Sequence, residues 1–225
     1  MSFDTLGFQA RSIHDIELVC QPFKIVKTIE GPAPLSSLRI GFVETDLFKP
    51  DSTDDMFSVW DEAKRLLAAA GVAISDVVLG PEFEGLSGVV GKAAMAARAE
   101  IGVNLLANVQ VGGDKVSAFS REPVEEMDHI DKKEVVSVLD KLAALRPKID
   151  QIASQFDALI TPSSPGEAGT VGVPADHAYV CMWTGLHVPM INMPGLASKG
   201  GLPIGLSLVG PRYVLRTQIP TRLAR

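Results

Sequence analysis

The sequence has few of the residues that would mark a metal centre or a disulfide scaffold. Among 225 residues there are two cysteines, Cys20 and Cys181, and four histidines. None of them has the C-x-x-C or H-x-x-x-H spacing of a metal site, and two thiols do not make a disulfide framework. We therefore expect no bound metal, and two partly buried thiols in a reducing, cytoplasmic location.

Long hydrophobic runs, cofactor motifs and strongly basic stretches are missing as well. No run approaches the roughly 20 apolar residues that span a membrane, and no secretory leader pattern opens the chain. Neither the dinucleotide pattern nor the P-loop pattern occurs. The formal charge is −6, which argues against a nucleic-acid surface. These absences predict no membrane span, no cofactor and no nucleic-acid partner.

The charge is uneven along the chain. No Asp or Glu follows Asp176, whereas five Lys or Arg residues do. Those five are too widely spaced to indicate an anion or membrane surface strongly. We interpret residues 214–225 as an atypical basic tail and residues 1–213 as one structural unit.

Hydrophobic periodicity predicts an α/β fold with a mixed β-sheet flanked by helices. Residues 39–45 and 72–79 are typical of short buried strands, and the intervening residues 51–70 follow a helical period that Gly71 ends. Strand, helix and strand within about forty residues predict a parallel βαβ unit with a right-handed crossover.

The remaining segments are assigned by the same criteria. A capped helix is expected to begin at Ser12, and Pro147 is expected to kink or split a helix near Leu145. Residues 109–128 have mixed polarity and are expected to form a loop. Further helices are predicted over 83–108, 131–155 and 175–186, and further strands over 157–161, VPMINMP and LPIGLSLVG.

One loop carries the candidate polar site. The sequence TPSSPGE, from Thr161 to Glu167, follows the carboxyl end of a predicted strand, where ligands bind in open α/β sheets. Ser163 and Ser164 offer hydroxyl groups that the flanking prolines hold in place. A plain surface turn explains the same composition, so both interpretations remain open.

An independent serine hydrolase site has little support in the sequence. His177 and His187 follow the TPSSPGE loop, but no G-x-S-x-G pattern surrounds any serine. Trp183 lies in a predicted helix before the strand VPMINMP, where it fills either the core or a pocket wall.

Three segments in this order resemble the C-terminal part of the amidase-signature hydrolases, which cleave amide C–N bonds. They are DTLGFQARSIHD, DALITPSSPGEA, and WTGLHVPMINMPG followed by GLPIGLSLVGPRY. The resemblance implies a partial amidase-signature fold and a small-molecule amide substrate. It also implies that Thr161, Ser163, Ser164 and Trp183 line the substrate site.

The resemblance further implies that no catalytic residue lies in these 225 residues. The family uses a serine nucleophile, a second serine in a cis peptide and a lysine, all before the segment that DTLGFQARSIHD resembles. No GSSGG-like stretch occurs here. We therefore expect an N-terminally truncated chain that is inactive alone and exposes sheet edges able to pair with another chain. The alternatives are a non-catalytic binding or regulatory remnant and a fragment of an amidotransferase A-type subunit.

Overall fold

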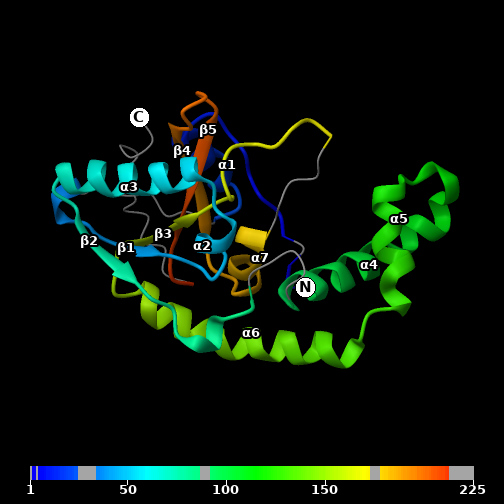
Figure 1. Ribbon diagram of the computed structural model, residues 1–225. Coiled ribbons are helices and arrows are strands. Elements are labelled where there is room, and N and C mark those ends of the chain that lie inside the picture. Colours follow the sequence, from blue (N-terminus) through cyan, green and yellow to red (C-terminus); the bar gives the residue numbers. More distant parts are fainter. Residues whose placement is uncertain (1, 4, 25–33, 87–91, 173–177, 213–225) are drawn as a thin grey trace.

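A computed structural model of the chain describes residues 2–3, 5–24, 34–86, 92–172 and 178–212. The predicted tail over 214–225 lies outside these residues. The described residues contain a mixed five-stranded sheet with the order β2-β1-β3-β5-β4, flanked by helices (Figure 1). The α/β fold predicted from the sequence is thus confirmed. The strands are β1 (Arg39–Val43), β2 (Ala73–Val77), β3 (Ala158–Pro162), β4 (Met190–Ala197) and β5 (Pro203–Val209).

The predicted βαβ unit is present. Strands β1 and β2 are parallel neighbours, and helix α3 (Asp54–Ala69) connects them. The hydroxyl of Thr53 accepts a hydrogen bond from the Met56 N–H and caps the helix, and Gly71 follows it with φ +84°. β1 also pairs in parallel with β3, whereas β5 runs antiparallel to both β3 and β4.

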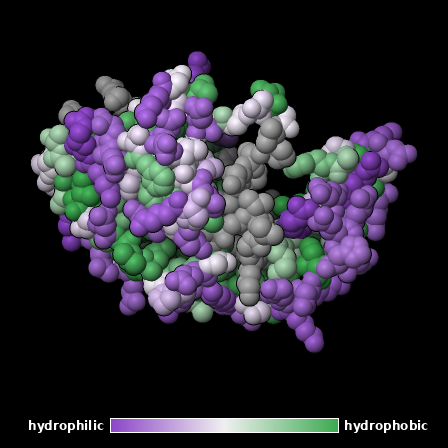
Figure 2. Space-filling view, viewed as in Figure 1, coloured by the Kyte–Doolittle hydropathy of each residue, from purple (hydrophilic) through white to green (hydrophobic). Residues whose placement is uncertain are grey.

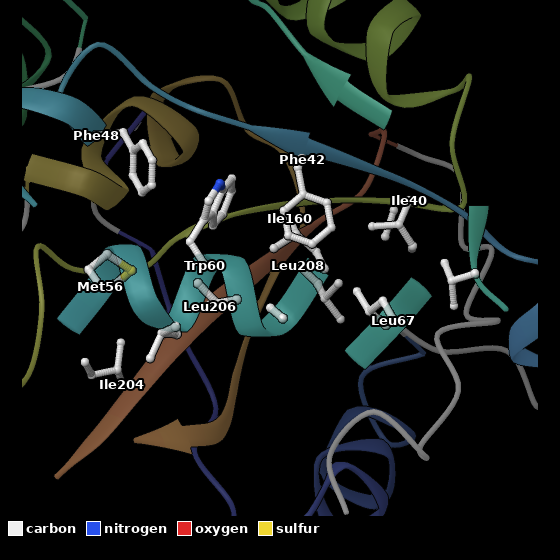
Figure 3. Close-up of a cluster of buried hydrophobic side chains, with 14 of the residues drawn as sticks. Ile40, Phe42, Phe48, Met56, Trp60, Leu67, Ile160, Ile204, Leu206 and Leu208 are labelled. Carbon is white, nitrogen blue, oxygen red and sulfur yellow. The ribbon is translucent and has the colours of Figure 1, made fainter. Parts of the chain in front are cut away.

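One face of the sheet packs against α3. Trp60 of α3 meets Phe42 of β1 edge to face, with ring centroids 4.9 Å apart, an arrangement favoured for aromatic pairs. Figure 3 shows side chains of α3 and of the strands interleaved in this core. The members labelled there are Ile40, Phe42, Phe48, Met56, Trp60, Leu67, Ile160, Ile204, Leu206 and Leu208.

The other face packs against α6 (Lys132–Ala153) and α7 (Ala178–Gly185). Leu159 of β3 and Val209 of β5 meet Leu142 of α6 and Trp183 of α7 in this second core, and all four are 0 % exposed. Helices therefore cover both faces of the sheet, and β2 and β4 are its two edge strands.

A helical excursion extends away from the sheet (Figure 1). It consists of α4 (Lys92–Gly112) and α5 (Ala118–Glu125), with a short 3₁₀ turn after each. Hydrophilic side chains cover most of α5 on the face that Figure 2 shows. The prediction of a loop over 109–128 was wrong, because α4 continues to Gly112 and α5 packs on α4 rather than on the sheet.

Of the predicted kink or split at Pro147, the split does not occur, because α6 is continuous across it. Leu142 and Leu145 before the proline, and Ile149 and Ala153 after it, are all buried in one core. Burial of this continuous stripe outweighs the roughly 3 kcal/mol that an interior proline costs a helix. The helix predicted to start at Ser12 is present as α1 (Ile13–Cys20), and a short helix, α2 (Phe48–Asp51), follows β1.

Candidate functional site: a polar cluster at the carboxyl end of β3

The parallel strands β1, β2 and β3 end at the same edge of the sheet, where ligands bind in open α/β folds. The loop that follows β3 begins at this edge with Ser163. It lies over the start of α3, since the Thr53 N–H donates to the Pro165 carbonyl at 2.8 Å. The predicted polar loop is therefore fixed to a helix N-terminus.

Ser163 is the centre of a three-residue hydrogen-bonded cluster. Its hydroxyl donates to Oδ1 of Asn192 on β4 at 2.8 Å and lies 2.8 Å from the Ser207 hydroxyl on β5. A serine hydroxyl has one proton, so the Ser207 hydroxyl donates to Ser163. Ser207 is buried, Ser163 is half-buried and Asn192 is exposed, which places a polar chain from the sheet interior to solvent.

Glycines allow both sides of this cluster to pack closely. A Cβ atom on Gly205 would lie 2.4 Å from the Asn192 Oδ1, so the amide side chain lies directly over β5. A Cβ atom on Gly166 would lie 2.5 Å from the Thr53 Oγ1. The Ser164 hydroxyl donates to the Gly166 carbonyl at 2.7 Å and closes the turn locally. Ser164 therefore holds the loop shape, while Ser163 faces the neighbouring strands.

Two of the four predicted site residues are fully buried. Thr161 and Trp183 are both 0 % exposed, and Trp183 belongs to the core formed with α6. The Thr161 Oγ1 and the Trp183 Nε1 have no hydrogen-bond partner among the described residues, although buried polar groups are normally paired. The role of both residues at a substrate site stays a prediction.

Sequence reasoning identified Ser163 but missed its partners. Asn192 and Ser207 are 29 and 44 positions away in the chain, and the strand pairing that unites them cannot be derived from local pattern. The available signal was a polar residue inside each late apolar strand, in VPMINMP and in LPIGLSLVG.

Among the residues that the structure describes, no general base lies beside Ser163. Its hydroxyl contacts an amide and another hydroxyl, and neither is a base of useful strength. The Nε2 of His187 lies 3.0 Å from an Arg146 guanidinium nitrogen instead, and His177 lies outside the described residues. Partial burial lowers the pKa of His187, and the Arg146 and Arg212 guanidinium groups lower it further.

A metal site is also without support in this part of the chain. Within residues 2–3, 5–24, 34–86, 92–172 and 178–212, no three His, Cys, Asp or Glu side chains come together closely enough to hold a metal ion. No described helix is long and apolar enough to cross a membrane.

Solved structures with this fold are amide hydrolases in several cases. An amidase crystal structure superposes with a TM-score of 0.71 at 18% identity, covering 95% of this chain and 50% of that one. A fatty acid amide hydrolase gives a TM-score of 0.69 at 14% identity, covering 93% of this chain and 45% of that one. The structure of 6-aminohexanoate cyclic dimer hydrolase gives 0.63 at 17% identity, covering 96% and 52%.

The present chain thus spans about half the length of the solved structures that it matches. No curated protein matches the sequence. The profile of one family, described as Amidase, matches residues 1–214. Because this match covers nearly the whole sequence, the chain belongs to the Amidase family.

Proposed function

We propose that the chain supplies the amide-binding part of an amidase active site and does not itself carry the serine nucleophile. The observation that supports this is the Ser163 hydroxyl, held between Asn192 and Ser207 at the carboxyl end of β3. In this proposal the whole protein hydrolyses amide C–N bonds, and the substrate site also includes Thr161, Ser164 and Trp183.

The cluster matches an amide in hydrogen-bonding chemistry. Ser207 donates to Ser163, and Ser163 donates to the Asn192 oxygen, so the Asn192 NH₂ group remains to donate to a substrate carbonyl. The second lone pair of the Ser163 oxygen remains to accept from the substrate NH₂ group. The exposed position of Asn192 makes this donor accessible. Sites built from fixed hydrogen-bonding groups of this kind orient small ligands.

The same contacts disfavour Ser163 as a nucleophile. A serine nucleophile needs a base within hydrogen-bond reach and a group that orients the base, and Ser163 contacts neither among the described residues. The sequence also lacks the Gly/Ser-rich stretch in which the family's nucleophile lies. We infer that these residues position a substrate and take no part in bond cleavage.

Titration of the chain with hexanamide, followed by NMR of backbone amides, tests the proposal. We expect weak binding with shifts centred on Ser163, Asn192 and Ser207, and weaker shifts with 2-heptanone, which replaces the amide NH₂ by a methyl group. Ser163→Ala should weaken binding about fivefold, because one neutral hydrogen bond contributes about 1 kcal/mol.

The matched control is Ser154→Ala, the same substitution at an exposed serine that ends α6. It should leave hexanamide binding unchanged. Equal binding of the amide and the ketone, or equal effects of the two serine substitutions, would contradict the proposal.

A second candidate function is pairing with another chain through a sheet edge, as in a non-catalytic module. Among the described residues β2 pairs with β1 alone, and Ser75 and Asp76 on it are exposed. The opposite edge, β4, contains Pro194 and a register shift between Met193 and Leu196, features that hinder further pairing. Edge β2 is therefore the better surface for a partner strand.

Oligomeric state measured by light scattering tests this candidate. If β2 pairs between chains, Ser75→Lys should shift the protein toward the monomer, since lysine on an edge strand opposes pairing. The control Ala197→Lys places the same charge on β4 and should have no effect. A monomeric unsubstituted chain at high concentration would rule the candidate out.

We also infer a cytoplasmic location. Cys20 is a buried free thiol, and free thiols are typical of a reducing compartment. Measurement of the thiol redox state in cells, with a disulfide-bonded form as the contradicting result, tests this inference.

A further inference from the structure

A pocket of about 410 Å³ opens at the carboxyl ends of β1 and β2, apart from the Ser163 cluster. Phe42, Val77, Leu79, Phe83 and Met182 give it apolar walls. The volume lies within the range of small-molecule sites, which combine mainly apolar walls with a few fixed polar groups. The pocket is therefore large enough for a compact organic ligand.

The polar lining is mostly acidic. Four carboxylates and one lysine face the pocket, and the four are Glu44, Asp46, Asp76 and Glu84. Glu44 pairs with Lys49 at 3.3 Å, and Asp76 pairs with Lys64 at 2.6 Å. Neither Asp46 nor Glu84 forms an ion pair within the described residues. The pocket thus keeps two carboxylates that are not paired with any cation in the described part of the chain.

Thr45 provides a separate indication of a ligand. It lines the pocket, is 7 % exposed, and its hydroxyl has no hydrogen-bond partner among the described residues. A buried hydroxyl without a partner is destabilising, so its retention beside a pocket favours a bound group that pairs with it. As donor and acceptor, the hydroxyl suits an N–H group.

We propose that this pocket binds a primary ammonium ligand with an apolar body. The ammonium group pairs with Asp46 and Glu84 and donates to the Thr45 hydroxyl, while the hydrocarbon part lies against Phe42, Phe83 and Met182. A bare metal ion suits the pocket less well, because no described group of three acidic, His or Cys side chains is close enough to hold one. The proposal does not rest on amide hydrolysis.

Isothermal titration of the chain with phenethylammonium tests the proposal, with 2-phenylethanol and phenylacetate as neutral and anionic probes of similar shape. We expect the cation to bind at least tenfold more tightly than the alcohol, and the anion not to bind. NMR shifts caused by the cation should map to the residues that follow β1 and β2.

Substitutions distinguish binding in the pocket from a general effect of the protein's net charge. Asp46 accepts a hydrogen bond from the Gly85 N–H, which asparagine preserves, so Asp46→Asn removes charge without removing that contact. We expect Asp46→Asn and Glu84→Gln each to weaken phenethylammonium binding about tenfold. The control Asp114→Asn makes the same change in net charge at an exposed site beyond α4 and should leave binding unchanged.

Thr45→Val keeps the shape of the side chain and removes the hydroxyl. It should weaken binding several-fold while leaving the unliganded fold as stable or more stable, since the described residues give the hydroxyl no partner. Equal binding of cation and alcohol, no binding at millimolar concentration, or equal effects of Asp46→Asn and Asp114→Asn would overturn the proposal.

Discussion

Gly166 allows the loop after β3 to lie directly on the first turn of α3. The Thr53 side chain that it contacts is also the N-cap of that helix. One small residue therefore holds two features together, the loop that carries Ser163 and the capped end of the helix that covers one face of the sheet.

Gly166→Ala is predicted to destabilise the protein by about 1–3 kcal/mol, because the new methyl group would force the Thr53 cap out of position. Urea unfolding measures the change. At Gly169 in the same loop, an added Cβ meets nothing within 4 Å, so Gly169→Ala is the matched control. Equal stability of the two variants would show that the close contact has no energetic role.

At the residue scale, His187 makes the stability of the folded state depend on pH. Its lowered pKa means that the folded state prefers the neutral ring more strongly than the unfolded chain does. The contribution to stability is present above the ordinary value of 6.5 and is lost as the pH falls through the lowered pKa.

His187→Asn should flatten the fall in stability below pH 6.5, and asparagine tolerates the positive φ of 59° at this position. Denaturant midpoints measured from pH 7.5 to pH 5 test this. An identical pH profile in the variant would mean that His187 titrates as it does in an unfolded chain.

At the scale of elements, the helices and strands whose sequences have a regular hydrophobic period were predictable. The apolar positions of α3 and the runs flanking it were sufficient to predict a parallel βαβ unit, which the structure confirms. Helix α5 was missed because its stability comes from packing on α4, and its own residues include Pro123 and carry no long apolar stripe.

The candidate site was likewise predictable only in part. The Ser163 loop was predictable from its prolines, its serines and its position after an apolar strand. Its contacts with Asn192 and Ser207 depend on β4 and β5 folding back onto β3, and that pairing is a property of the sheet rather than of any local segment.

The continuity of α6 leads to a direct prediction. Pro147 is exposed and makes no core contact, so Pro147→Ala should raise stability by about 1–3 kcal/mol through the recovered backbone donor. Pro81 starts a 3₁₀ turn, where proline is well tolerated, and Pro81→Ala should give no gain. Thermal unfolding compares the two, and equal gains would contradict this account of α6.

At the scale of the whole molecule, two hydrophobic cores lie on opposite faces of one sheet, each closed by its own helices. The Amidase family match extends over both. The polar cluster and the acidic pocket lie at the edge where β1, β2 and β3 end. The scaffold thus places both candidate binding sites at one edge, while the described residues show no serine hydroxyl paired with a base.

The most direct test of this account is the reaction of the chain with a fluorophosphonate probe, followed by mass spectrometry of its peptides. We predict no covalent adduct on any serine, because a serine without a base reacts too slowly. An adduct on Ser163 would contradict the central claim and make this serine the nucleophile of an amidase site contained within these 225 residues.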